Sequence, residues 1–424
     1  MKNFVQRMLA NLARQILAKH KPKIIGITGS VGKTSTRDAI YAVVSTAFSV
    51  RKGEKNFNNE FGLPFAILGV SGPERNIFKW LMVFIKGYFT LWIGGYPKVL
   101  ILEMGVDKPG DMDYLLSIAK PDISVLTNIG LAHYEFFQTM EAVAQEKGKL
   151  VEALNHSGQN GVAILNADND LVKQQAIKAT DKGAKVITYG FTDSDVRVKI
   201  DNELFSSPAS TTLEVITHYN SFKATVKAIG LPHLSSCAAA VAVGLNLNIS
   251  QEDIVKGLSK YRPMAGRLNF LAGIKKTVII DDSYNASPDS VKAALQILRR
   301  TPQTKKVVVL GDMLELGDVS EQFHKQIGEL VADLNPDKFF AVGELAKHML
   351  DGAVEAGFPD SKTTWIKNSQ IAKDIIRDQI ESESIILVKG SQGARMERIS
   401  KELLLDPVSA SNVLPRQYGS WLNS

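Results

Sequence analysis

The stretch from Ile24 to Thr34 constrains the fold of this chain more than any other part of the sequence. It reads Ile-Ile-Gly-Ile-Thr-Gly-Ser-Val-Gly-Lys-Thr, so an apolar run leads through a glycine-containing turn to a lysine and a hydroxyl residue. This order predicts a buried strand, a phosphate-binding loop and the first turn of a helix. Backbone N–H groups of such a loop can surround the phosphates of a nucleotide triphosphate.

The loop is shorter than the general pattern for such a site, G-x-x-x-x-G-K-[ST]. That pattern would require glycine at the position of Ile27, whereas the match here is Gly29-x-x-Gly32-Lys33-Thr34. Lys33 can supply a point charge to the phosphates, and the hydroxyl of Thr34 can bind Mg²⁺. This departure from the general pattern reduces the number of nucleotide-binding protein classes to which the chain can belong.

Apolar runs alternate with helical patterns along most of the chain, which predicts an α/β fold with a parallel sheet and helices on its faces. Short alternating runs between residues 194 and 228 indicate a small antiparallel appendage. A second α/β series follows a junction at residues 262–267. The predicted strands are 23–28, 98–103, 122–127 and 162–165 in the first series, and 277–281, 306–310, 339–342 and 384–388 in the second.

These patterns predict three parts. The first is an N-terminal amphipathic helix over residues 1–22. A first α/β domain, with the P-loop and a parallel sheet, would cover residues 23–265, and a second, Rossmann-like α/β domain would cover residues 266–424.

The composition is that of an ordinary globular protein, with 45% hydrophobic and 22% charged residues. The net charge of +6 suits an anionic substrate or a membrane surface but is weak evidence for either, and we expect no nucleic-acid partner. A single cysteine, Cys237, excludes an intrachain disulfide and a cysteine-based zinc site. With no signal-peptide pattern in the first residues, we expect a cytoplasmic protein and, as the simplest case, a monomer.

Two stretches have the amphipathic or apolar character of membrane-contacting segments. Residues 2–19 place Val5, Leu9 and Ile16 on one helical face, and residues 77–93 are rich in aromatic side chains. Lysines interrupt the second stretch, so a spanning helix is not expected. Peripheral docking on a membrane remains one interpretation; packing on the protein itself is the one we favour.

Chemistry-bearing residues follow the predicted strands. Glu103 follows the second strand, Asn128 and His133 the third, and Asn166 the fourth. Ligands of α/β sheets bind at the carboxyl ends of the strands, so a carboxylate and a histidine beside the phosphate loop could hold Mg²⁺.

Lys147 occupies an unusual position. In the helix after His133 it shares a face with Val143, Leu150 and Leu154, all apolar. A buried lysine pays a desolvation cost unless it is paired or neutralised, and the opposite interpretation is a lysine that reaches the surface. The sequence favours neither. His324 and His348 are interpreted as surface histidines.

The chain resembles the Mur ligase family, which are ATP-dependent amide-bond ligases of peptidoglycan precursor synthesis. The resemblance covers about residues 23 to 404, and its motifs stand in family-like order and spacing. Within the family the chain is most similar to members that add D-alanyl-D-alanine. The motifs are residues 28–34, 56–64, 103–105, 133, 146–148, 166–168, 266–267, 281–288, 311–317 and 389–391.

The resemblance implies a role for each matching residue. Nucleotide binding falls to Gly29, Ser30, Val31, Gly32, Lys33, Thr34, Ser35, Asn166, Arg267 and Asp282. Catalysis falls to Lys33, His133, Lys147 and Arg267. Metal binding falls to Thr34, Glu103, His133 and Lys147. Substrate binding falls to Asn58, Asn59, Asn285, Lys389 and Ser391.

The implied reaction has two steps and uses ATP with two Mg²⁺ ions. A substrate carboxylate attacks the γ-phosphate to give an acyl phosphate, and the amine, D-alanyl-D-alanine, then attacks the acyl carbon. Lys147 would be carbamylated, because addition of CO₂ turns an awkward cation into an anion whose two oxygens can orient Mg²⁺. The partners would be a small-molecule peptidoglycan precursor and the amine.

Three departures from the family pattern leave alternatives open. Only about 22 residues precede the first strand, too few for the usual UDP-sugar-binding domain. Leu234 and Cys237 stand where asparagines near adenine are usual, and Gln392 stands where arginine often follows the Lys-Gly-Ser motif. The alternatives are a related ligase acting on a lipid-linked or other non-UDP acceptor, and a non-catalytic nucleotide-binding scaffold.

Overall fold

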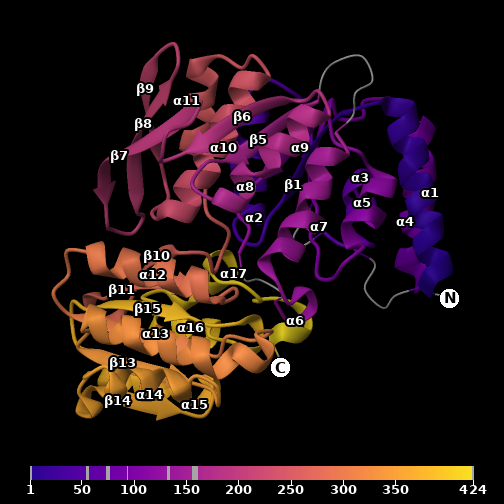
Figure 1. Cartoon of the computed structure of the whole chain (residues 1–424). Coiled ribbons are helices and arrows are strands. Elements are labelled where there is room, and N and C mark those ends of the chain that lie inside the picture. Colours follow the sequence, from indigo (N-terminus) through magenta and orange to yellow (C-terminus); the bar gives the residue numbers. More distant parts are fainter. Residues whose placement is uncertain are drawn as a thin grey trace.

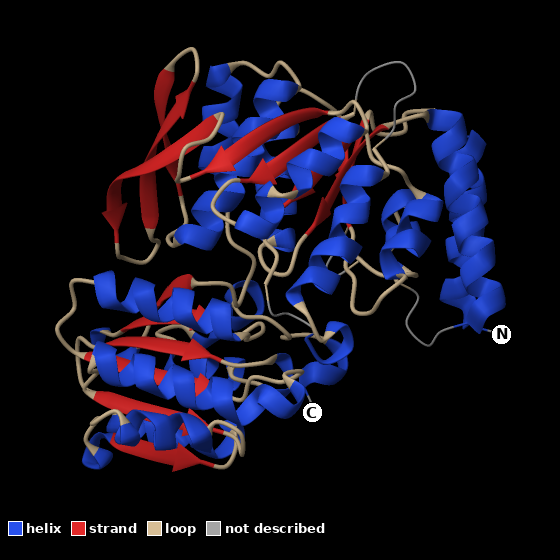
Figure 2. Cartoon of the chain, in the orientation of Figure 1, coloured by secondary structure: helices blue, strands red, loops and turns tan. Residues whose placement is uncertain are grey.

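Two β-sheets, formed by successive parts of the chain, organise the fold (Figure 1). The computed structural model describes residues 2–53, 57–72, 77–92, 94–130, 134–154 and 161–422. Figure 2 shows helices on both faces of each sheet. The expected α/β class, with parallel strands at the centre of each sheet, is confirmed.

The first sheet has the strand order β2-β3-β1-β4-β5-β6-β7-β8-β9. The first seven strands in this order pair in parallel, and their central members are mostly apolar because both of their faces are covered. The strands are β1 (Lys23–Thr28), β2 (Val50–Lys52), β3 (Val99–Glu103), β4 (Ile123–Leu126), β5 (Val162–Asn166), β6 (Lys185–Gly190), β7 (Val196–Leu204), β8 (Ser210–Thr217) and β9 (Ser221–Val226).

The antiparallel strands β7, β8 and β9 are not a separate appendage. β7 pairs in parallel with β6 through Tyr189 and Val196, so the hairpin strands extend the same sheet. The expectation of antiparallel strands between residues 194 and 228 is confirmed, and their separation from the main sheet is wrong. Local alternation identifies a strand but does not determine its neighbour in space.

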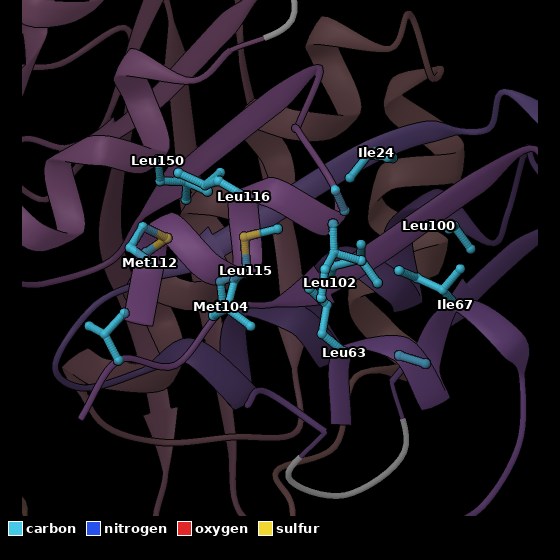
Figure 3. Close-up of a cluster of buried hydrophobic side chains, with 14 of the residues drawn as sticks. Ile24, Leu63, Ile67, Leu100, Leu102, Met104, Met112, Leu115, Leu116 and Leu150 are labelled. Atoms are coloured by element: carbon cyan, nitrogen blue, oxygen red, sulfur yellow. The ribbon is translucent and has the colours of Figure 1, made fainter. Parts of the chain in front are cut away.

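Successive strand residues alternate between two cores. Ile24 and Leu100 join the helices of one face in the core shown in Figure 3, while Ile25 and Ile101 join those of the other. The first face carries α1 (Lys2–His20), α3 (Gly62–Leu68), α4 (Ile77–Trp92), α5 (Asp111–Ile118), α6 (Tyr134–Phe137), α7 (Met140–Glu152), α8 (Asp170–Lys173) and α9 (Gln175–Asp181). The second carries α2 (Lys33–Val44), α10 (Leu231–Asn246) and α11 (Gln251–Lys260).

The N-terminal helix α1 packs on the protein with its apolar face. Leu9, Ala13 and Ile16 are fully buried and belong to the same core as α3, α4 and α5. None of the helices in the described part of the chain has both the length and the apolar character needed to cross a bilayer.

The second sheet has the order β10-β11-β15-β12-β13-β14, in which only β10 runs antiparallel to its neighbour. Its strands are β10 (Asn269–Ala272), β11 (Val278–Asp282), β12 (Lys306–Gly311), β13 (Lys338–Val342), β14 (Thr363–Ile366) and β15 (Ile385–Lys389). One face carries α12 (Pro288–Arg300), α13 (Ser320–Leu334) and α14 (Lys347–Glu355), and the other carries α15 (Ser369–Gln379), α16 (Glu397–Leu403) and α17 (Ala410–Val413).

Candidate active site

The phosphate loop leaves β1 at Thr28 and enters α2 at Lys33, as the sequence predicts. Gly29 (φ +151°) and Gly32 (φ +88°) have backbone conformations that other residues rarely adopt. A Cβ on Gly29 would lie 2.0 Å from the hydroxyl of Thr127, which donates a 2.6 Å hydrogen bond to the carbonyl of Val31. The end of β4 therefore holds the loop in place, and no side chain fits at residue 29.

Lys33 lies over its own loop. Its ammonium donates to the carbonyl oxygen of Gly29 at 2.7 Å. Burial lowers the pKa of Lys33, and the nearby Glu103 carboxylate opposes this shift. The cation thus sits at the mouth of a loop whose backbone N–H groups begin α2, an arrangement that suits an anionic ligand.

Glu103, at the carboxyl end of β3, contacts side chains from several other segments. It ends β3 next to Ile27 of β1, and it is 3% exposed. Its carboxylate accepts hydrogen bonds from the Thr34 hydroxyl at 3.1 and 3.2 Å and from the Asn58 amide at 3.3 Å. Arg37 lies 3.5 Å from the same carboxylate. A partly neutralised carboxylate beside a threonine hydroxyl is a suitable ligand pair for a hard cation.

Lys147 is buried in α7, with 1% of its surface exposed. Burial holds its pKa well below the usual range, the charge of Lys33 lowers it further, and Asp107 and Glu146 oppose the shift. Glu146, the preceding residue, accepts hydrogen bonds from the backbone N–H groups of Gly110 and Met112. Of the two interpretations left open by the sequence, the buried lysine is correct.

Arg267 enters from the junction between the two sheets. Its guanidinium carbon lies 4.4 Å from the centre of the Tyr284 ring, and its buried Nε finds no hydrogen-bond partner in the described residues. Gly266 (φ +76°) allows this close approach, because a Cβ there would lie 3.0 Å from the backbone nitrogen of Tyr284, whose N–H donates to the Gly266 carbonyl at 3.0 Å. The guanidinium is therefore oriented by stacking, and a donor remains available.

Asp282 and Lys389 form a buried ion pair at the carboxyl ends of β11 and β15, with 2.6 Å between their charged atoms. Burial raises the pKa of Asp282, and Lys389 opposes the shift. Lys389 also donates to the carbonyl of Asn285 at 2.9 Å, and Asp282 accepts from the backbone N–H of Leu268. The pair ties the second sheet to the junction.

His233, at the start of α10, is buried between the two parts of the chain. One ring nitrogen lies 2.8 Å from the hydroxyl of Tyr261 and the other 2.9 Å from the carbonyl oxygen of Arg267. Burial lowers the pKa of His233 to about 4, so the ring is neutral at pH 7. It positions the backbone from which the Arg267 side chain extends.

A cavity of about 570 Å³ joins these groups. Residues of both sheets line it, and most of the site residues predicted from the sequence are among them. These are Ser30, Val31, Gly32, Lys33, Thr34, Ser35, Asn58, Glu103, Arg267, Asp282, Asn285 and Lys389.

The remaining predicted residues lie elsewhere. Gly29 and Lys147 do not line the cavity. Asn59 caps α3 by accepting from the backbone N–H of Gly62, and Asn166 bonds to the carbonyl of Thr127 and the N–H of Asp168. Ser391 is buried and accepts from the backbone N–H of Leu314. His133 lies outside the described residues.

Asp107 and Tyr284, which had no assigned role in the sequence analysis, also belong to the site. Asp107 lines the cavity and acts electrostatically on both Lys33 and Lys147. Its position in the loop four residues after Glu103, the last residue of β3, was the available signal. Tyr284 stacks on Arg267 and lies within a motif that the sequence analysis quoted for other residues.

The interpretation of His324 as a surface histidine is wrong. His324 is fully buried, accepts from the backbone N–H of Met313 at 3.0 Å and contacts the carbonyl of Ser320 at 2.7 Å. The backbone turn that follows β12 needs an acceptor at this point, and the imidazole supplies it.

Comparisons with known proteins agree with this geometry. Residues 93–244 match the Mur ligase middle domain, and residues 266–392 match the Mur ligase, glutamate ligase domain. The UDP-N-acetylmuramoyl-tripeptide–D-alanyl-D-alanine ligase of Bacillus subtilis is 32% identical over 403 residues, which cover 95% of this chain and 80% of that protein.

Solved structures of Mur ligases are also similar to this chain. MurF from Acinetobacter baumannii superimposes with a TM-score of 0.78 at 27% identity, over 94% of this chain and 80% of that one. MurF ligase from Thermotoga maritima in complex with ADP gives a TM-score of 0.75 at 26% identity, over 94% and 83% of the two chains. With both domain matches and this level of identity over nearly the whole chain, this chain belongs to the Mur ligase family.

Proposed function

We propose that this protein is the ATP-dependent ligase that joins D-alanyl-D-alanine to UDP-N-acetylmuramoyl-tripeptide in peptidoglycan precursor synthesis, forming a new C–N amide bond. One observation carries the proposal. Lys33, Thr34 and Glu103, which belong to the first sheet and its phosphate loop, line the same cavity as Asp282 and Lys389 of the second sheet and Arg267 of the junction. A reaction that activates one substrate and delivers another needs binding residues for both substrates around one cavity.

The nucleotide belongs on the phosphate loop. Residues 29–35 would bind the phosphates of ATP through their backbone N–H groups, with Lys33 as the cation. Arg267 would reach the γ-phosphate, because its guanidinium is oriented by Tyr284 and its Nε has no partner in the described part of the chain. Asp282 would accept from the ribose. Asn166 would act on the nucleotide indirectly, by holding Thr127 at the base of the loop.

Thr34 and Glu103 would hold Mg²⁺, since a hydroxyl and a carboxylate 3.1 Å apart present the oxygen ligands that this ion prefers. His133 is assigned to the same role by resemblance. The ion supplies charge neutralisation between a substrate carboxylate and the triphosphate. Arg37 compensates part of the charge of Glu103 from the protein side.

Lys147 would be carbamylated. Burial and the charge of Lys33 favour its neutral amine, which is the form that reacts with CO₂. The amine nitrogen would bond to the carbon of CO₂ as one carbon–oxygen π bond breaks, and the amine proton would pass to water, leaving a carbamate anion. This anion would attract Lys33, whereas a protonated Lys147 would repel it, and its two oxygens could serve as metal ligands.

Asn58 would lie beside the acyl substrate, and Asn285 and Lys389 beside the incoming amine. Asn59 and Ser391 would support them by capping α3 and by holding the backbone at Leu314. We further propose the division into residues 1–22, 23–265 and 266–424, with the cavity between the last two parts.

Phosphate release and product mass test the proposal. The full chain should release phosphate and form the adduct when supplied with ATP, Mg²⁺, UDP-N-acetylmuramoyl-tripeptide and D-alanyl-D-alanine together, and not when either substrate is withheld. Lys33→Ala should abolish both signals, and Lys23→Ala, which changes an exposed lysine at the start of β1, should leave them unchanged. Equal turnover by both variants, or no adduct with the full set of substrates, would overturn it.

A further inference from the structure

A continuous row of large apolar side chains runs along the outer side of α4. Its members recur at intervals of three and four residues, so they point to the same side of the helix. Each exposes between 39% and 76% of its surface, and together they form the α4 face: Phe78, Leu81, Met82, Ile85, Tyr88, Phe89 and Trp92. A row of this size is more than the scattered apolar residues of an ordinary surface and marks an interaction site.

The opposite side of α4 is firmly packed. Val83 is buried, and Gly87 lies so close to α1 that a Cβ there would be 2.5 Å from Leu12. Trp80 contacts the rings of Phe61 and Phe65. The helix therefore cannot turn its apolar row inward, and the α4 face is a fixed feature of the fold.

The surroundings of the α4 face are basic. In Figure 1, α1 and α4 lie side by side at the edge of the molecule, away from the second sheet, and the two helices are in contact. Neither helix contains an aspartate or a glutamate. Their exposed basic residues are Arg7, Arg14 and Lys19 on α1 and Lys79 and Lys86 on α4.

The basic residues of α4 lie at a border of the apolar row. Lys79 and Lys86 are seven residues apart, about two helical turns, and each stands directly after a member of the row, Phe78 or Ile85. Lys19 of α1 lies with its ammonium 4.6 Å from the centre of the Trp92 ring at one end of the row. An apolar stripe bordered by lysines matches a surface that is apolar inside and anionic outside.

We propose that the α4 face docks this protein on the surface of an anionic phospholipid bilayer. α4 would lie in the plane of the interface, with its row of apolar side chains among the acyl chains and with Lys79, Lys86 and Lys19 at the phosphates. The tyrosine and tryptophan of the row suit the headgroup level. α1 packs on the protein with its apolar side and adds Arg7 and Arg14 to the basic surroundings.

A second copy of the chain is a poorer occupant. Two α4 faces placed against each other would bring the basic residues of both α4 helices and both α1 helices together. Neither α1 nor α4 contains an aspartate or a glutamate that could pair with the basic residues of the other copy. Like charges at close range oppose such a pairing, whereas an anionic membrane surface is attracted by the same charges.

Co-flotation of the full chain with lipid vesicles tests the proposal. The protein should float with vesicles of phosphatidylcholine mixed with phosphatidylglycerol, and less with phosphatidylcholine alone. The double variant Leu81→Ser/Phe89→Ser should lower the partition coefficient about tenfold or more, because both side chains would enter the bilayer. The variant Lys79→Gln/Lys86→Gln should reduce binding to the anionic vesicles only.

The matched control is Ile177→Ser/Val408→Ser, which removes two side chains that are 67% and 87% exposed elsewhere on the surface. This variant should float like the parent. All variants should keep the circular dichroism melt and the phosphate release of the parent, because none of these residues lines the cavity. Absence of flotation, or flotation that Leu81→Ser/Phe89→Ser leaves unchanged, would overturn the proposal. Self-association without lipid that the same variant abolishes would instead assign the α4 face to a second copy.

Discussion

The hydroxyl of Thr34 lies 3.1 Å from the carboxylate of Glu103, although 69 residues separate them in the chain. Parallel pairing of β1 with β3 brings them together, because the carboxyl ends of both strands reach the same edge of the sheet. The contact joins the first turn of α2 to a second strand end, and Asn58 completes it from a third segment.

Glu103→Gln tests the electrostatic role of this contact. The amide keeps the shape of the side chain and its contact with Thr34 but removes the negative charge, so activity should fall by about 100-fold or more. The Mg²⁺ concentration for half-maximal phosphate release should rise in the same variant. A fall in activity with an unchanged Mg²⁺ dependence would show that Glu103 acts by packing alone.

Lys147→Ala should abolish ligation, and a short carboxylic acid added to the solution should restore part of the activity by supplying the missing oxygens. Lys149→Ala is the matched control on the same helix, since Lys149 is partly exposed and is paired with Asp113 and Glu146. Phosphate release with and without the added acid measures both. Full activity of Lys147→Ala without the acid would contradict the carbamate role.

Arg267→Lys should lose most of the activity, because an ammonium cannot stack on Tyr284 and donate in the plane of a guanidinium. Arg262→Ala, in the same junction, is the control: Arg262 donates only to the carbonyls of Ser259 and Tyr261 among the contacts of the described residues. The dissociation constant for ATP and the rate of phosphate release should change in the first variant and not in the second.

His233 and Asp281 should give stability profiles of opposite sign. The pKa of His233 is lowered to about 4, so between pH 6.5 and 4 the unfolded chain binds the proton that the folded one refuses, and stability falls as the pH falls. The pKa of Asp281 is raised to about 7 by burial, so the folded chain holds the extra proton and stability falls as the pH rises from 4 to 7.

Urea denaturation at several pH values measures both effects. Relative to the parent, His233→Gln should remove up to about 3 kcal/mol of the loss of stability on acidification, and Asp281→Asn up to about 4 kcal/mol of the loss on alkalisation. Parallel profiles for parent and variant would show that the residue titrates alike in both states.

Gly29→Ala should destabilise the protein by more than Gly110→Ala. Both glycines have a positive φ, but a Cβ on Gly110 meets nothing within 4 Å, whereas one on Gly29 meets the Thr127 hydroxyl. Gly110→Ala should therefore cost about 1 kcal/mol of backbone strain, and Gly29→Ala should add a steric clash and weaken ATP binding. Thermal melts and ATP titrations of the two variants, compared side by side, distinguish the effect of backbone strain, which both share, from that of the steric clash at residue 29.

Local pattern was sufficient for much of this fold. The loop from Gly29 to Thr34 and the buried runs on either side of it were predicted, because β-strand and helix periodicity depend on neighbours in the chain. The position of Lys147 was left open, since its burial depends on how α7 rotates against α5 and α9, and those contacts are distant in sequence.

Contacts between distant segments account for the rest. The edge at which β7 joins β6, the stack of Arg267 on Tyr284 and the burial of His324 under the β12 turn are each decided by which segments meet in space. A charged residue four positions past a strand end, such as Asp107, becomes a site residue only when the loop turns back toward the cavity.

The hairpin formed by β7 and β8 connects the first sheet to the second through non-covalent contacts, in addition to the covalent junction at residues 262–267. Phe205 and Ala209, at the tip between these strands, pack into the core of the second sheet, where Phe205 contacts Phe270. Arg300 of α12 forms an ion pair with Glu203 of β7 at the same place. Any swing of the second sheet relative to the first must pivot about this tip or break it, so the hairpin limits the direction in which the walls of the cavity can open.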